Sequence, residues 1–135
     1  MILVDAGPLV ALLHSTDQHH ERCRRALKAI TEPLASVWPA VSEAMYLLNF
    51  SEKAQQGLWE MLEMNSPTLI DLIPTDFPRM RNLMKQYRDL PMDLADAALV
   101  CVAERLRIPK IFTVDRRDFD VYRPRGFGRF SILPS

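Results

Sequence analysis

The stretch PMDLADAALVCVAERLRIPKIFTVD, residues 91–115, decides the predicted fold. It predicts a helix over about 93–107 and, after a short turn, a strand over 111–114. The helix is apolar on nearly every side over most of its length, which is typical of a buried helix. Its first turn is nevertheless acidic, because Asp93 and Asp96 stand three residues apart and share one face. A buried helix that begins on two acids indicates a polar site inside an otherwise apolar structure.

The rest of the chain alternates predicted strands with predicted helices. Short apolar runs that end in turn residues predict strands, and amphipathic stretches behind capping residues predict helices. We expect further strands over 1–4, 34–37, 68–72 and 130–133, and further helices over 9–14, 18–30, 39–49, 51 to about 65, and 77–87. The tail, residues 116–135, is rich in Arg and Gly, and its last strand is the one element expected there. This alternation predicts an α/β protein with a parallel sheet covered by helices on both faces.

Length and composition predict one domain over residues 1–135, with no internal repeat or linker. No apolar run approaches the ~20 residues of a membrane span, and no basic region precedes the first apolar run, so a cytoplasmic protein is expected. Two cysteines far apart, Cys23 and Cys101, fit a reducing compartment. The formal net charge is zero. Binding of nucleic acid would therefore depend on a local patch of charge.

Four acids fall where the carboxyl edge of this sheet is expected. Asp5 and Asp115 directly follow strands, and Glu43 and Asp96 lie in the first turns of helices. Ligands of parallel sheets bind beyond the carboxyl ends of the strands, so we expect these carboxylates to converge. No Lys or Arg neighbours them before Arg116, which makes a hard divalent cation the natural counter-charge. Mg²⁺ or Mn²⁺ held by carboxylates suits hydrolysis of phosphodiester bonds.

Taken singly, these acids have simpler explanations. Asp93 is best explained as a helix N-cap, and Asp5 or Asp115 alone could be a turn former. Glu43 alone would be a solvated helix residue. Asp96 is harder to explain in this way, because it lies between two alanines of a buried helix, and we favour a functional role. The joint placement of the acids at strand ends supports a site.

The four acidic segments together resemble the motifs of PIN-domain ribonucleases, and most of all the VapC-type toxins of bacterial toxin–antitoxin pairs. They read VDAGPL (4–9), PAVSE (39–43), LADAA (94–98) and FTVD (112–115). The resemblance implies a three-layer α/β/α sandwich, an endoribonuclease activity with RNA as substrate, a small antitoxin partner and a homodimer. It also implies a catalytic quartet made of Asp5, Glu43, Asp96 and Asp115, with Thr113 beside it. Within this quartet, Asp5, Asp96 and Asp115 are the expected ligands of Mg²⁺ or Mn²⁺.

This sequence departs from the resemblance at Gly7, where many relatives have Ser or Thr two residues after the first Asp. Asp93 resembles an extra acid found in part of the family. A chain that had lost one of the four acids would suggest a module that binds RNA or protein without cleaving, but all four are present. Phosphoryl transfer through an aspartyl intermediate on Asp5 is disfavoured, because no second Asp stands at position 7 and Lys110 precedes its strand.

The arginines of the tail form a second candidate feature. Arg116, Arg123 and Arg125 are interleaved with aromatic residues, which is compatible with an RNA-binding rim beside the acids. Asp118 and Asp120 dilute this charge, and the aromatic residues could equally pack beneath a loop. The sequence leaves both interpretations open. His14, His19 and His20 lack the spacing and the further ligands of a metal site, and a surface helix explains them better.

Overall fold

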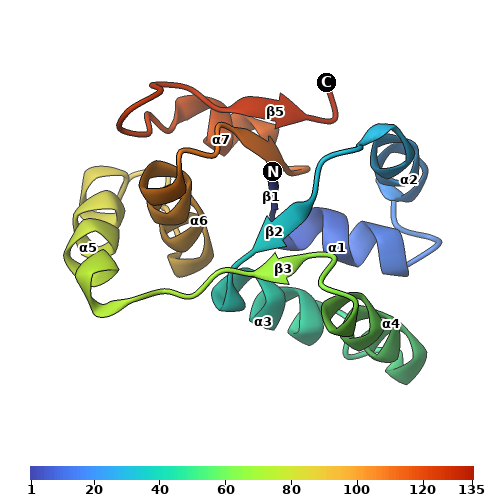
Figure 1. The fold of residues 1–135 in the computed structure, drawn as a ribbon. Coiled ribbons are helices and arrows are strands. Elements are labelled where there is room, and N and C mark those ends of the chain that lie inside the picture. Colours follow the sequence, from blue (N-terminus) through green and yellow to red (C-terminus); the bar gives the residue numbers. More distant parts are fainter.

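A parallel sheet of five strands runs through the middle of the computed structural model, which describes all 135 residues (Figure 1). The strand order is β3-β2-β1-β4-β5, and all neighbouring strands are parallel. The strands are short: β1 (Ile2–Val4), β2 (Leu34–Ser36), β3 (Thr68–Leu69), β4 (Lys110–Phe112) and β5 (Ser131–Leu133). Because β1 lies at the centre of the sheet, its carboxyl end is flanked by the ends of β2 and β4.

Helices cover both faces of this sheet, as a three-layer α/β/α sandwich requires. They are α1 (Ala6–Leu13), α2 (His20–Ala29), α3 (Trp38–Leu47), α4 (Glu52–Glu63), α5 (Phe77–Gln86), α6 (Leu94–Leu106) and α7 (Arg116–Val121), with a 3₁₀ turn η1 (Pro74–Asp76) before α5. Helix α3 contacts both α1 and α6. None of these helices combines the length and the apolar character of a membrane span.

The two faces of the sheet carry separate apolar cores. Alternate residues of a strand point to opposite faces, so Leu3 enters the core around α6, whereas Ile2 and Val4 enter the core around α1 and α4. The α6 side is the larger cluster, with 21 buried residues against 13 on the other side. The larger cluster joins α6 to the elements that follow it in sequence, through residues such as Ile111, Phe119 and Ile132.

Helix α6 is as buried as its sequence predicts. Nine consecutive residues, Ala95–Ala103, are buried. Asp93 is the N-cap: its Oδ1 accepts a hydrogen bond of 2.8 Å from the Asp96 amide. The helix ends at Arg107, which adopts a left-handed conformation with φ of 56°. The predictions of a buried helix and of Asp93 as its cap are confirmed.

Several predicted boundaries were wrong, and each has a local cause. Helix α1 starts at Ala6 instead of residue 9, because Asp5 itself is the N-cap and Pro8 is tolerated in a first turn. Strand β3 has two residues instead of five, since it pairs with β2 alone at the edge of the sheet. Helix α2 starts at His20, two residues later than expected, because the chain first makes a turn in which Asp17 Oδ1 accepts a hydrogen bond from the His19 amide.

Helix α7 was not predicted at all. Its sequence, RRDFDV, spans less than two turns, which is too short for a helical periodicity to be recognised. Asp115 is its N-cap and accepts a hydrogen bond from the Asp118 amide at 3.4 Å. Phe119, the one buried residue of this helix, packs into the core on the α6 side. The helix thus follows β4 directly and turns the chain back towards the start of α6.

Candidate active site

Asp5 is fixed at the centre of the carboxyl edge by its neighbours on β4. Its amide donates to the carbonyl of Phe112 at 3.0 Å, which continues the pairing of β1 with β4. Its Oδ1 accepts from the Ala6 amide at 2.8 Å, and its Oδ2 accepts from the Thr113 hydroxyl at 3.0 Å. The same Thr113 oxygen accepts from the Asp115 amide at 2.9 Å. One buried hydroxyl therefore links the backbone that carries Asp115 to the carboxylate of Asp5.

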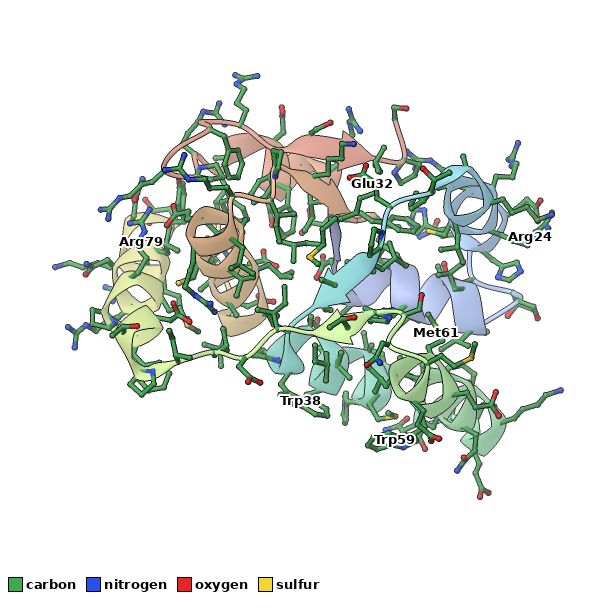
Figure 2. All side chains as sticks on the ribbon, in the orientation of Figure 1. Arg24, Glu32, Trp38, Trp59, Met61 and Arg79 are labelled. Carbon is green, nitrogen blue, oxygen red and sulfur yellow. The ribbon has the colours of Figure 1, made fainter.

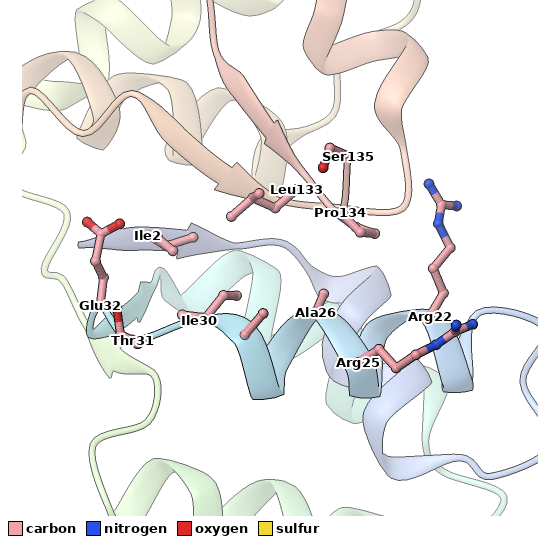
Figure 3. A pocket seen from close by; sticks show the side chains of 11 residues that line it. Ile2, Arg22, Arg25, Ala26, Ile30, Thr31, Glu32, Leu133, Pro134 and Ser135 are labelled. Carbon is pink, nitrogen blue, oxygen red and sulfur yellow. The ribbon is translucent and has the colours of Figure 1, made fainter.

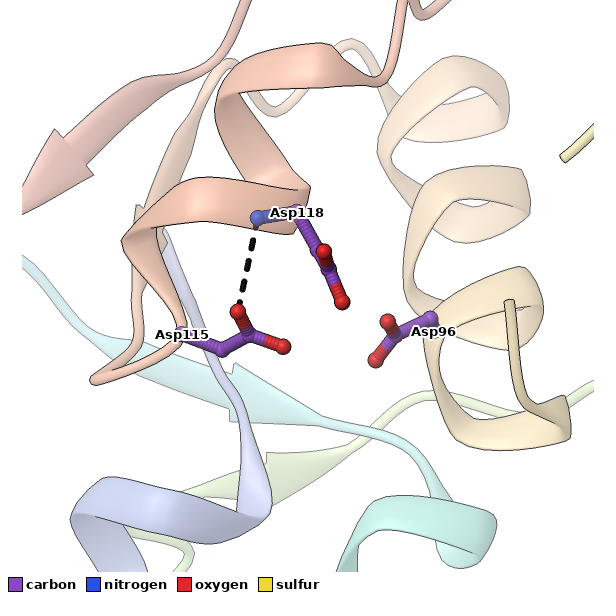
Figure 4. A group of neighbouring side chains, drawn as sticks. All are labelled: Asp96, Asp115 and Asp118. Atoms are coloured by element: carbon purple, nitrogen blue, oxygen red, sulfur yellow. Dashed lines mark hydrogen bonds between the residues drawn. The ribbon is translucent and has the colours of Figure 1, made fainter. Parts of the chain in front are cut away.

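A group of three carboxylates lies next to this pair, between α6 and α7 (Figure 4). Asp96 comes from the first turn of α6, Asp115 caps α7, and Asp118 comes from the first turn of α7. One carboxylate oxygen from each lies within 4.8 Å of the other two. Asp96 is buried, whereas Asp115 and Asp118 are half-buried. Three oxygen ligands at this spacing suit a hard divalent cation.

The carboxylate of Asp96 is held from the interior by a tyrosine. The hydroxyl of Tyr122, just beyond α7, donates to Asp96 Oδ2 at 2.6 Å. The Tyr122 side chain is fully buried, and its ring makes edge contacts with Tyr87 and Phe119 at centroid distances of 5.0 and 5.2 Å. Asp96 Oδ1 makes no hydrogen bond within the protein. One side of the carboxylate is thus occupied and the other remains open.

The electrostatics of the site show crowded negative charge. Burial, together with the charges of Asp5, Asp93 and Asp115, raises the pKa of Asp96 to about 8, despite the opposing hydrogen bond from Tyr122. Burial also raises the pKa of Asp5 to about 6, against the hydrogen bonds from Ala6 and Thr113. The pKa of Asp115 is raised by burial and by its neighbour Asp118. None of these acids belongs to any of the five ion pairs in the molecule.

Glu43 borders a groove at the edge of this acidic group. It lies on α3 and is exposed, and the groove of about 530 Å³ that it lines also includes Asp93 and the exposed Trp38. The pKa of Glu43 is raised by burial and then by the charge of Asp93. The charge of Asp93 raises the pKa of Asp5, Asp96 and Asp115 as well. Asp93 therefore caps α6 and also contributes to the negative potential of the site.

The three arginines of the expected RNA rim are all exposed but do not gather around the acids. Arg116 Nη1 donates to the Pro134 carbonyl at 3.2 Å, and Arg123 Nη1 donates to three carbonyls at the end of α7. The amide of Arg125 donates to Glu104, which lies on α6 about 12 Å along the helix axis from Asp96. Arg125 lines a cleft at that end together with Arg79 and Arg105.

A further cleft, of about 510 Å³, separates α2 from the C-terminal strand (Figure 3). Arg22 and Arg25 of α2 lie at one end of it. Ile2, Ile30 and Leu133 contribute apolar walls. None of the acids described above lines this cleft. It is therefore separate from the candidate active site.

Two residues of the site were missed by reasoning from the sequence. Asp118 was regarded only as diluting the charge of the arginines, although the spacing of Asp115 and Asp118 repeats the Asp-x-x-Asp pattern of residues 93 and 96. That repeated pattern was the available signal. Tyr122 was one of several aromatic residues in the tail, and nothing in the sequence distinguishes it. Its contact with Asp96 spans 26 residues and depends on the fold.

The structure also shows what surrounds the glycine at position 7. A β-carbon on Gly7 would lie 2.4 Å from Val114 Cγ2, on the strand end that carries Thr113 and Asp115. A serine or threonine in this place would therefore require the Val114 side chain to move. The small residue allows α1 to pack closely against the segment that follows β4.

A parallel α/β/α sandwich with acids from β1, α3, α6 and α7 at one edge of the sheet agrees with the family to which the sequence was compared. The chain belongs to the PIN domain family, which matches residues 2–123. The prediction of the family and that of the fold class are confirmed.

Individual proteins and solved structures are also similar to this chain. The chain is 26% identical to Ribonuclease VapC26 of Mycobacterium tuberculosis (strain ATCC 25618 / H37Rv), over 98% of this chain and 100% of that protein. The crystal structure of Mycobacterium tuberculosis VapC20, a sarcin–ricin loop cleaving toxin, is similar with a TM-score of 0.75 at 14% identity, covering 82% of this chain and 87% of that one. A toxin–antitoxin complex from Klebsiella pneumoniae is similar with a TM-score of 0.66 at 19% identity, covering 88% and 90%.

Proposed function

We propose that this protein is a Mg²⁺- or Mn²⁺-dependent endoribonuclease and the toxin of a type II toxin–antitoxin pair. The observation that carries the proposal is the group of acids at the carboxyl edge, which is crowded, partly buried and without a cationic partner. Membership of the PIN domain family and similarity to Ribonuclease VapC26 support the same activity.

We keep the predicted ligands Asp96 and Asp115 and add Asp118, because one oxygen of each lies within 4.8 Å of the other two. Asp5, the third predicted ligand, accepts hydrogen bonds on both oxygens and lies close enough for its charge to raise the pKa of Asp96, so we propose it as a neighbour of the ion. All donors are carboxylate oxygens, which favour Mg²⁺ or Mn²⁺ over metals that prefer nitrogen or sulfur. A bound ion would neutralise the carboxylates, activate water and stabilise the leaving oxygen of a phosphodiester. Glu43, on the groove side, is the fourth member of the proposed catalytic quartet with Asp5, Asp96 and Asp115, and Asp118 is an addition to that quartet.

The remaining residues of the site hold these groups or face the RNA. Thr113 orients Asp5 and the start of α7 through its two hydrogen bonds. We propose that Arg116, Arg123 and Arg125 contact RNA phosphates outside the metal site, since all three are exposed. Arg123 would do so through the guanidinium N–H groups that α7 does not use.

The proposal is tested by incubating the purified protein with mixed RNAs in Mg²⁺, in Mn²⁺ and in chelator, and then mapping the RNA ends. We expect cleavage with either ion and none in chelator. Millimolar ion should also raise the melting temperature, because a ligand that binds only the folded state stabilises it. An Asp96→Asn variant is the matched control and should not cleave. RNA binding without cleavage under any condition would instead indicate a binding module.

Two protein partners are part of this proposal, and exposed apolar side chains support both. Figure 2 shows Trp38 and Trp59 on the outer side of α3 and α4, and both are about half exposed. The α3–α4 surface, which we propose for an antitoxin, continues through further exposed side chains: Tyr46, Leu47, Phe50 and Met64. A second surface, which we propose for a homodimer, contains the exposed side chains of Phe77 and Leu94, and Leu94 also lines the acidic groove.

The homodimer is tested by light scattering of the purified protein. We expect a mass of two chains for the unchanged protein and of one chain for Phe77→Glu. Met64→Glu, on the α3–α4 surface, should leave the dimer intact. A single-chain mass for the unchanged protein at high concentration would contradict the dimer while leaving the nuclease proposal untouched.

An RNA substrate would place the activity in the cytoplasm.

A further inference from the structure

We propose that Tyr122 is a positioning residue of the metal site, which orients the Asp96 carboxylate so that its free oxygen can bind the divalent ion. The inference rests on the proposed metal site and adds a residue that is not itself a ligand. Its basis is the 2.6 Å hydrogen bond from the Tyr122 hydroxyl to Asp96 Oδ2.

The position of the Tyr122 hydroxyl is set by rigid surroundings. The side chain is fully buried, and it packs between Tyr87 beyond α5 and Phe119 of α7. Phe119 packs in turn against Phe130 at a centroid distance of 5.6 Å. The backbone on either side is also held, since the Tyr122 amide donates to the backbone carbonyl of Asp118 and the Arg123 amide donates to the Tyr87 hydroxyl. The ring therefore has little freedom to carry its hydroxyl away from Asp96.

The hydrogen bond leaves the two oxygens of Asp96 in different situations. Oδ2 is occupied by Tyr122, whereas Oδ1 has no partner within the protein. An oxygen of Asp96 lies within 4.8 Å of oxygens of Asp115 and Asp118. A buried carboxylate without an internal hydrogen bond could rotate about its last torsion, which is broad for such groups. Tyr122 removes that freedom and so prepares one geometry for the ion.

Tyr122 also connects the site to α7 as a whole. Asp115 caps this helix, Asp118 lies in its first turn, and Tyr122 follows its last residue. A single short helix therefore delivers two proposed ligands and the group that orients the third. Partners that orient metal ligands in this way typically matter for metal affinity by 10–100-fold. We therefore expect a measurable effect from the loss of one hydroxyl.

The test is the Mn²⁺ affinity of metal-stripped protein, measured by the electron paramagnetic resonance signal of free Mn²⁺ during titration. Tyr122→Phe keeps the ring and removes only the hydroxyl. We expect its Mn²⁺ affinity to fall by about tenfold. Half-maximal RNA cleavage should then need about tenfold more Mn²⁺, and cleavage should recover at saturating Mn²⁺.

Tyr87→Phe is the matched control, because it removes a hydroxyl from the same aromatic cluster without touching a carboxylate. Its Mn²⁺ affinity should be unchanged. Equal affinities for Tyr122→Phe and the unchanged protein would overturn the inference, as would an equal loss in both variants, which would indicate general loosening of the cluster. Absence of Mn²⁺ binding by the unchanged protein is a distinct result, and it would overturn the proposed metal site together with this inference.

Discussion

The replacement Asp96→Asn should make the metal-free protein more stable at pH 8 and leave it unable to cleave RNA. Asparagine keeps the shape of the side chain and can still accept the hydrogen bond from Tyr122. It removes a charge that burial and the neighbouring acids disfavour. Functional sites often trade stability for activity in this way.

The size of the effect follows from the pKa of Asp96. A pKa that rises from 3.8 to about 8 on folding corresponds to a ceiling of about 6 kcal/mol, at 1.36 kcal/mol per pH unit. Water entry and relaxation reduce such values, so we expect about 2 kcal/mol. Because the pKa of Asp96 is raised on folding, the folded state holds this proton more tightly than the unfolded state does. The stability that this proton contributes is fully present below pH 4 and is lost as the pH rises towards 8.

The assay is denaturant unfolding in chelator at pH 5 and at pH 8. The free energy of unfolding of the unchanged protein should fall between these values by about 1 kcal/mol more than that of Asp96→Asn, because part of the effect is already lost by pH 5. Asp120→Asn, an exposed acid of α7, is the control and should behave like the unchanged protein. Identical pH dependence for Asp96→Asn and the unchanged protein would refute this account of the site, as would retained cleavage by Asp96→Asn.

Three further predictions concern the groups around Asp96. Asp93→Asn should hardly change chelator-treated melting curves, because Asn caps a helix as well as Asp. Asp93→Ala should instead lower the free energy of unfolding by about 1 kcal/mol. Loss of cleavage in Asp93→Asn would show that Asp93 does more than cap α6. Thr113→Val should lower the free energy of unfolding by about 1–3 kcal/mol, since the Asp115 amide loses its buried acceptor; an unchanged denaturant midpoint would contradict the role of this hydroxyl. Replacing Arg116, Arg123 and Arg125 with Gln should weaken RNA binding uniformly across sequences and flatten its salt dependence, measured by filter binding at several salt concentrations. An unchanged dependence of binding on salt concentration would contradict the RNA rim.

The sequence by itself determined the layered fold and the place of the acids. The apolar run that follows Asp96 has one physical solution, a helix buried on all sides, and alternating strands and helices require a parallel sheet. Asp5 and Asp115 follow apolar runs, so the strand-end rule places them at one edge without knowledge of any contact. These inferences succeed because periodicity and strand ends are properties of a few neighbouring residues.

The tertiary structure alone decided how the site is completed. Helix α7 is too short to leave a periodic pattern, yet it places Asp118 beside Asp96 and Asp115. The hydroxyl of Tyr122 reaches Asp96 across 26 residues. Arg116 lies at the start of α7, Arg123 bonds to carbonyls at its end, and the Arg125 amide bonds to Glu104 towards the far end of α6. Such contacts depend on the packing of α6 against the elements that follow β4. Local sequence patterns carry no information about side-chain pairs that only this packing brings together.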